Sequence, residues 1–204
     1  MKKYISEIIG TFFLVYTVCC TVSTNQPLAA ISIGLALAVM VYAGGHLSGA
    51  HYNPAVTVAV LLRGKIGLTD AIIYIFCQTV AGVVAAMVAK TLVGAGTDPK
   101  PFPIDNLMLA EAIGTFALAW VVLNVATTKA NNNNSFYGAA IGLTVTSGAV
   151  AVGGVSGAAF NPAVATGAVA MGLLNGGQLW AYWVFCILGG AVAAIVFKAI
   201  KADD

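Results

Sequence analysis

The tripeptide Asn-Pro-Ala occurs twice in the chain, as Asn53-Pro54-Ala55 and as Asn161-Pro162-Ala163, and each copy opens a short apolar segment. Proline is favoured in the first turn of a helix, and the asparagine before it is a good N-cap, so each motif predicts a helix start. Two helix starts that face one another would offer side-chain amides to a small polar molecule, while their positive ends would repel a cation. Taken singly, each motif predicts no more than a capped turn.

Glu7 and Glu111 lie at matching positions in two apolar stretches. A carboxylate within a membrane is costly and indicates a function. Two functions remain open: a proton relay, or a structural brace that accepts hydrogen bonds from the backbone of nearby loops. The brace is favoured because irregular backbone at membrane depth exposes N–H groups that need partners.

No catalytic or metal site can be assembled from the other polar residues. His46 and His51 precede the first motif, but no carboxylate lies beside them, and two histidines are too few for a metal site. The cysteines lie in apolar runs without metal-ligand spacing and are predicted to be buried thiols: Cys19, Cys20, Cys77 and Cys186. The sequence thus predicts no enzyme, no catalytic residue, no metal and no cofactor.

The composition predicts that lipid is the solvent for most of the surface. Of the 204 residues, 60% are hydrophobic and 8% are charged, with a formal net charge of +2. A soluble domain carries about 25% charged residues. The composition therefore excludes an ordinary cytosolic enzyme, a nucleic-acid binder with a basic face and a disordered segment.

Six apolar stretches are long enough to cross a membrane, which takes about 17 residues or more. They lie near residues 5–24, 28–45, 68–90, 107–127, 136–153 and 178–199, and two shorter apolar segments lie near 53–62 and 161–172. Irregular backbone is expected before each short segment, over residues 44–52 and 153–160. Small residues within the spans are expected where helices pack closely: Gly10, Gly34, Gly82, Gly142 and Gly190.

The chain repeats itself. A shift of 108 residues places Ser48-Gly49-Ala50 on Ser156-Gly157-Ala158 and the first Asn-Pro-Ala on the second, while Glu-x-x-Gly-Thr-Phe begins at both Glu7 and Glu111. The chain is therefore predicted to be one all-α domain of two units, 1–96 and 105–204, each with three spans and one short segment. Because three is odd, the second unit must be inverted in the membrane, an architecture used by transport proteins. Inversion brings the two short helices together near the midplane.

The basic residues predict the orientation. With six spans both termini lie on one side, and that side receives seven of the nine Lys and Arg residues: Lys2, Lys3, Arg63, Lys65, Lys129, Lys198 and Lys201. Lys90 and Lys100 fall on the other side. The positive-inside rule places both termini in the cytoplasm. We expect an integral protein of the cell membrane, plasma or inner.

The stretch from Gly45 to Thr57, Gly-His-Leu-Ser-Gly-Ala-His-Tyr-Asn-Pro-Ala-Val-Thr, resembles the first pore loop of the aquaporin (major intrinsic protein) family, as does the Glu-x-x-Gly-Thr-Phe start of each unit. The resemblance covers nearly the whole chain. It implies a right-handed bundle of six helices and two half-helices, a pore in every subunit, and a homotetramer. It also implies that backbone carbonyls of eight residues line the pore: Gly49, Ala50, His51, Tyr52, Gly157, Ala158, Ala159 and Phe160.

The chain departs from the family where the family selects its solutes. Val164 stands where the second motif usually continues with arginine, and the other filter positions fall on Ile33, Ala149 and Ala158. Water-selective members usually carry an aromatic residue at the position of Ile33 and a histidine at the position of Ala149. This filter would be wide and uncharged, and it resembles that of some plant tonoplast members that pass urea or hydrogen peroxide with water. Ala165 replaces the aspartate usual in the glycerol subgroup, so a dedicated glycerol channel is not supported.

These observations predict a passive channel for water and small neutral solutes, such as urea, hydrogen peroxide, ammonia or glycerol-sized molecules. One alternative is a coupled secondary transporter, for which Glu7 and Glu111 would be the available carboxylates within the spans. Another is a structural membrane protein that keeps the fold and conducts nothing.

Overall fold

The computed structural model describes residues 1–96 and 99–200. Thr97 and Asp98, in the stretch between the third and fourth expected spans, and residues 201–204, at the end of the second unit, lie outside the described residues. The described residues form eight α-helices and one 3-10 helix at Gly176–Gln178. The α-helices are α1 (Lys2–Ser23), α2 (Ala29–Ser48), α3 (Pro54–Arg63), α4 (Leu68–Val93), α5 (Ile104–Thr127), α6 (Tyr137–Ser156), α7 (Pro162–Met171) and α8 (Leu179–Ile200).

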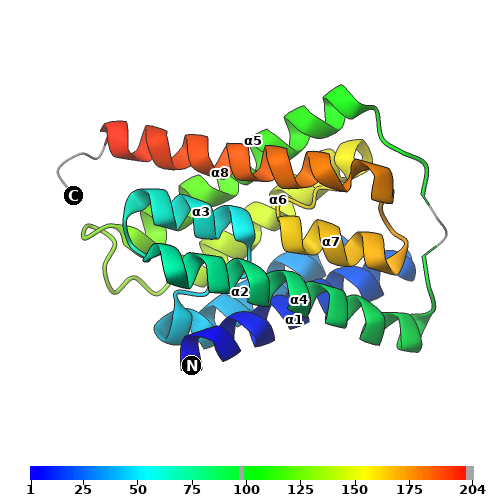
Figure 1. Ribbon diagram of the computed structural model, residues 1–204, viewed down its shortest axis with the longest axis horizontal. Helices are drawn as coiled ribbons and strands as arrows, with labels where there is room; N and C mark the ends of the chain where they lie inside the picture. Colours follow the sequence, from blue (N-terminus) through cyan, green and yellow to red (C-terminus); the bar gives the residue numbers. More distant parts are fainter. Residues whose placement is uncertain (97–98, 201–204) are drawn as a thin grey trace.

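Six of these helices, α1, α2, α4, α5, α6 and α8, are long and apolar enough to cross a membrane, whereas α3 and α7 have ten residues each. The all-α arrangement of six spans and two half-helices is confirmed. Figure 1 shows the half-helices in the middle of the molecule, end to end, with their N-terminal ends facing one another.

The loops before the half-helices are shorter than expected. Residues 44–48 and 153–156 continue α2 and α6, so irregular backbone is confined to residues 49–52 and 157–160. The helices end where Gly49 and Gly157 adopt a left-handed conformation, each with φ of 83°. Earlier glycines in these runs do not break the helices. A Cβ on Gly44, for example, would lie 2.7 Å from Ser6 Oγ, so this glycine permits close packing.

Each half-helix packs against a long helix of the other unit: α3 against α8, and α7 against α4. Glycines allow the close approach. A Cβ on Gly190 would lie 2.6 Å from the carbonyl oxygen of Ala55, and one on Gly82 would lie 2.7 Å from that of Ala163. The two units therefore interlock at the centre of the molecule.

The other small residues serve two purposes. Gly34 and Gly142 face one another where α2 packs on α6, as expected of helix-packing positions. Gly10 differs from the expectation, because the space above it is occupied by the ring of Tyr52 from the first loop rather than by another helix. Gly114 accommodates the ring of Phe160 in the same way.

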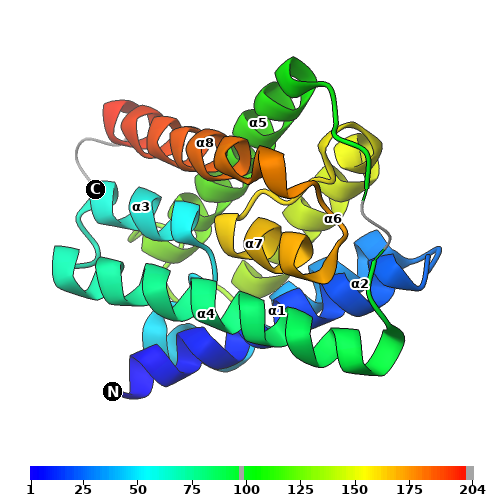
Figure 2. The same cartoon turned by 45° about the vertical axis from the view of Figure 1, so that its right-hand side comes forward.

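The start of α1 and the end of α8 lie at the same end of the molecule, together with the connections α3–α4 and α5–α6 (Figure 2). Six of the basic residues belong to these segments or to the helix ends beside them: Lys2, Lys3, Arg63, Lys65, Lys129 and Lys198. The expected seventh, Lys201, lies outside the described residues. The two ends of the molecule therefore differ in their content of basic residues.

Candidate functional site

Both motif asparagines cap the half-helices they precede. Asn53 has extended backbone (φ −157°), and its Oδ1 accepts from the N–H of Ala55 at 2.8 Å and of Val56 at 3.4 Å. Asn161 repeats the geometry at 2.9 and 3.4 Å. Proline follows in each case, so both half-helices begin as the motifs predict.

The amide nitrogens of the two asparagines tie the units together. Asn53 Nδ2 donates to the carbonyl oxygen of Phe160, and Asn161 Nδ2 donates to that of Tyr52, both at 2.8 Å. An amide carries two N–H groups, so one on each asparagine is committed to this reciprocal bond and a second remains. Sequence reasoning did not anticipate the crossing bonds, because nothing in either motif identifies a carbonyl about a hundred residues away.

The loops before the motifs hold an unusual backbone. Ala50 and Tyr52 have φ of 50°, and Ala158 and Phe160 have φ of 49° and 47°. Such left-handed conformations cost roughly 1–3 kcal/mol each for residues other than glycine. The surroundings must therefore stabilise the loops.

Glu7 supplies that stabilisation in the first loop. Its Oε1 accepts from the N–H of His51 at 3.0 Å and from the hydroxyl of Ser48 at 2.7 Å. Its Oε2 accepts from the N–H of Tyr52 at 2.7 Å and from Gln78 Nε2 at 2.8 Å. The Glu7 side chain is fully buried. These are the contacts that a structural brace requires.

Glu111 makes the matching contacts in the second loop. It accepts from the N–H of Ala159 at 3.0 Å, the N–H of Phe160 at 2.7 Å and the hydroxyl of Ser156 at 2.7 Å. The fourth donor differs, because Cys186 Sγ lies 3.4 Å from Glu111 where Glu7 has the amide of Gln78. A thiol is a weaker donor than an amide. The second carboxylate is therefore less strongly held.

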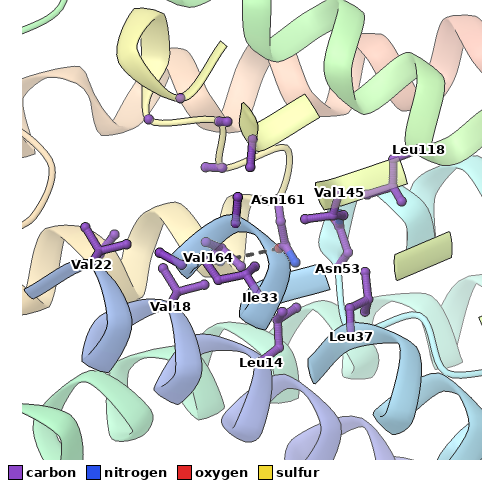
Figure 3. Close-up of a pocket in the computed structure, with 18 of the residues that line it drawn as sticks. Leu14, Val18, Val22, Ile33, Leu37, Asn53, Leu118, Val145, Asn161 and Val164 are labelled. Atoms are coloured by element: carbon purple, nitrogen blue, oxygen red, sulfur yellow. Dashed lines mark hydrogen bonds between the residues drawn. The ribbon is translucent and has the colours of Figure 1, made fainter. Parts of the chain in front are cut away.

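A cavity of about 450 Å³ passes beside both motif asparagines. All four expected filter residues line it: Ile33, Ala149, Ala158 and Val164. Figure 3 shows the apolar side chains that surround the amides of Asn53 and Asn161. Among the described lining residues, the polar side chains are those of His51, Asn53 and Asn161.

The eight residues expected to contribute carbonyls divide into three groups. Five line this cavity: Ala50, His51, Gly157, Ala158 and Ala159. Gly49 lines a second cavity. Tyr52 and Phe160 are lining residues of neither, and their carbonyl oxygens accept the crossing bonds from the asparagines.

The second cavity, of about 500 Å³, opens at the end of the molecule that carries the start of α1. Its wall is charged: Lys3 Nζ lies 2.6 Å from Asp70 Oδ2, and Lys65 is a further lining residue. His51 and Val122 line both cavities, and we call this shared position the neck. Sequence reasoning missed Val122, because a valine in an apolar span carries no signal. It considered the carbonyl of His51 as a pore-lining group and its imidazole only as a metal ligand.

No group that could hold a metal ion occurs within residues 1–96 and 99–200. The four cysteines are free thiols; Cys19 and Cys186 are buried, and Cys20 and Cys77 are partly buried. The site offers hydrogen-bonding groups along a cavity, an arrangement suited to the passage of small polar molecules.

Comparisons with known proteins agree with this geometry. The family model described as Major intrinsic protein matches residues 1–197. "Glycerol uptake facilitator protein-like 6" of Lactiplantibacillus plantarum is 33% identical, with all of both chains covered. "Aquaporin NIP1-2" of Arabidopsis thaliana is 32% identical over all of this chain and 76% of its own length. The X-ray structure of the aquaglyceroporin from Plasmodium falciparum has the same fold, with a TM-score of 0.85, 21% identity and coverage of 98% of this chain and 97% of that one.

Proposed function

The chain belongs to the major intrinsic protein family, a family of membrane channels, and is a passive channel for water and small neutral solutes; from this premise we propose that its pore runs through both cavities and also admits solutes larger than water. The expected resemblance to the family and the predicted function are thereby confirmed. The solutes proposed are urea, hydrogen peroxide, ammonia and glycerol-sized molecules.

The uncharged filter carries this proposal. Ile33, Ala149, Ala158 and Val164 bring no charge and no side-chain hydrogen-bonding group to the cavity that they line. An arginine in place of Val164 would add bulk, a permanent charge and five N–H donors. Without it, size discriminates weakly among small neutral solutes. One relative, which aligns over its whole length with the whole of this chain, is named for glycerol uptake. This supports larger solutes among those that the pore conducts.

Ion exclusion falls to the centre of the pore in this proposal. The N-terminal ends of α3 and α7 each carry roughly half a positive charge. A cation between them would be repelled after losing part of its hydration, whereas a neutral solute would accept the second N–H of Asn53 or Asn161. Glu7 and Glu111 act as braces that hold the loops in place, and neither relays protons.

The test is Val164→Arg, compared in lipid vesicles by stopped-flow light scattering with Val164→Met as a control for bulk without charge. We expect Val164→Arg to reduce urea flux by roughly tenfold more than water flux, an effect of about 1.4 kcal/mol. Val164→Met should change the ratio of urea flux to water flux little. An unaltered protein that passes water but no urea, ammonia, hydrogen peroxide or glycerol would refute the wide filter.

The same proposal includes the assembly and its placement. We infer a homotetramer in the plasma or inner membrane, with both termini in the cytoplasm. The membrane placement is supported by the excess of basic residues at the end that carries the start of α1 and the end of α8, and by exposed apolar side chains such as Phe13 and Leu143 on the spans. Chemical cross-linking in membranes should stop at four copies.

A further inference from the structure

The described part of the connection between α4 and α5 folds onto the connection between α7 and α8. The N–H of Gly96 donates to the carbonyl oxygen of Met171 at 2.9 Å. Further along, Gln178 holds both backbone polar groups of Phe102: its Oε1 accepts from the N–H at 3.0 Å, and its Nε2 donates to the carbonyl oxygen at 2.7 Å. Because the Gln178 side chain is buried, these two bonds are stronger than they would be in water.

The neighbours of Phe102 in the sequence limit its freedom further. Pro101 precedes it and Pro103 follows it. The ring of each proline fixes the φ of the proline itself, and a proline also disfavours helical backbone in the residue before it. The Phe102 side chain is therefore carried by a short, stiff segment that Gln178 binds at two points.

The Phe102 ring lies at the end of the first cavity that is opposite the start of α1. Figure 1 shows the connection between α4 and α5 at the end of the molecule opposite the N-terminus. Phe102 lines the first cavity there with Val22, near the end of α1, and Leu173, just after α7. A Cβ on Gly157, the residue before Ala158 of the filter, would lie 3.7 Å from Cε2 of the ring. The ring therefore borders the filter, and we call this end of the first cavity the far mouth.

Phe102 is large where the filter residues are small. Among the described residues that line the first cavity, it is the single Phe, Tyr or Trp, and it packs partly buried against the core. The filter residues carry short aliphatic side chains: Ile33, Ala149, Ala158 and Val164. An aromatic ring occupies far more space than these side chains. The steric limit on a solute therefore falls on the ring at the far mouth and not on the filter.

We propose that Phe102 is a specificity-determining residue that sets the upper size limit of the pore at the far mouth, and that Gln178 is the positioning residue that holds it there. The proposal rests on the function proposed above, since a limit at the far mouth matters only if solutes larger than water pass the filter. It narrows the solutes to neutral molecules up to the size of glycerol. Longer polyols, such as erythritol and ribitol, meet the ring.

The two units use one residue position in two ways. At the offset of 108, Asp70 near the start of α4 corresponds to Gln178 just before α8. Asp70 holds the start of its own unit, because Lys3 Nζ and the Tyr4 hydroxyl each donate to it at 2.6 Å. Lys3 lines the second cavity, as Phe102 lines the first. The same position thus supports a charged group at one mouth and an aromatic ring at the other.

Two substitutions test the ring and its anchor, and a third is the control. Phe102→Ala removes the ring. Gln178→Met keeps the length of the side chain and removes both hydrogen-bonding groups. Lys100→Ala alters an exposed residue of the same connection. Stopped-flow light scattering in lipid vesicles gives the water, glycerol, erythritol and ribitol fluxes of each variant.

We expect the unaltered protein and Lys100→Ala to pass glycerol much faster than ribitol. Phe102→Ala should raise the ratio of ribitol flux to glycerol flux roughly tenfold, which corresponds to a barrier lower by about 1.4 kcal/mol. Gln178→Met should raise the same ratio, and in the Phe102→Ala background it should raise it no further, because the anchor acts through the ring. If Phe102→Ala does not insert, Phe102→Leu removes the ring and keeps an apolar side chain, and the same rise is expected.

Three results would overturn the proposal. The first is an equal flux of glycerol and ribitol through the unaltered protein, and the second is a ratio that removal of the ring leaves unchanged. The third is a Gln178→Met variant that leaves the ratio unchanged, or raises it further in the Phe102→Ala background. Each of these results leaves the proposed function standing if the unaltered protein passes glycerol or urea. An unaltered protein that passes water but neither urea, ammonia, hydrogen peroxide nor glycerol would instead contradict the proposed function.

Discussion

At the scale of single residues, Glu7 and Glu111 accept hydrogen bonds from the two loops in the same way, but one of their four donors differs. Each accepts two backbone N–H groups and a serine hydroxyl, but the fourth donor is the amide of Gln78 for Glu7 and the thiol of Cys186 for Glu111. An amide donor must face an acceptor, whereas a thiol sulfur also accepts weakly. The matched pair therefore allows one substitution to serve as the control for the other.

Glu7→Gln is expected to destabilise the protein by about 1–3 kcal/mol, because one NH2 group must then face donors on either side of the side chain. Glu111→Gln should cost less. At the position of Oε2 its NH2 would face one N–H donor, that of Phe160, beside the weakly accepting sulfur of Cys186, whereas at Glu7 the same position faces two N–H donors. Thermal unfolding in detergent measures both. Equal losses of stability in the two variants would contradict the difference assigned to their fourth donors. A solute flux that follows a proton gradient in the unaltered protein would favour a proton relay.

Sequence reasoning found the residues with a local signature and missed those that depend on a distant partner. The caps at Asn53 and Asn161 follow from a motif. Thr57 entered only as the last residue of the stretch that resembles the family, and Gln78 gave no signal, because a threonine in a half-helix and a glutamine in a span acquire their role through contacts made in three dimensions. Val122 is one apolar residue among many in its helix.

At the scale of elements, hydropathy predicted each span and each half-helix, since length and composition decide what can cross a membrane. The ends of α2 and α6 were misjudged by a turn. Glycines at positions 44 and 153 suggested irregular backbone, yet the helices continue to Ser48 and Ser156. A sequence does not distinguish a glycine that ends a helix from one that admits a neighbour.

Gly190→Ala tests the close approach of α8 to the start of α3. The added Cβ would lie 2.6 Å from the carbonyl oxygen of Ala55, in a place where the backbone must shift, so we expect a loss of roughly 1–3 kcal/mol and a lower water flux. Gly67→Ala is the control, because a Cβ there meets nothing within 4 Å. If neither variant changes the temperature of thermal unfolding, α8 and α3 can move apart without a loss of stability, which would contradict the prediction.

At the scale of the whole molecule, the two units hold each other. Each half-helix packs on a long helix of the other unit, and each motif asparagine donates across the centre. The interlocking gives a physical reason to expect the two similar units to form one domain.

A chain cut in the connection between α4 and α5 provides the test. The two fragments, co-expressed, should associate and conduct water, whereas either fragment alone should conduct none, because each lacks the acceptor for its own asparagine. Co-purification and vesicle flux measure the two outcomes. Water conduction by a single fragment would show that the crossing bonds are dispensable.

The crossing bonds also bear on ancestry. An ancestor that encoded one unit would have had no acceptor for its asparagine within the same copy, so it would have functioned as two copies inserted in opposite directions. Its basic residues must then have been distributed evenly enough to permit both insertions. Duplication and fusion of such a unit would remove that requirement. Each half of the fused chain would then be free to take a fixed direction and to differ in its polar residues, as His51 and Ala159 differ at the offset of 108.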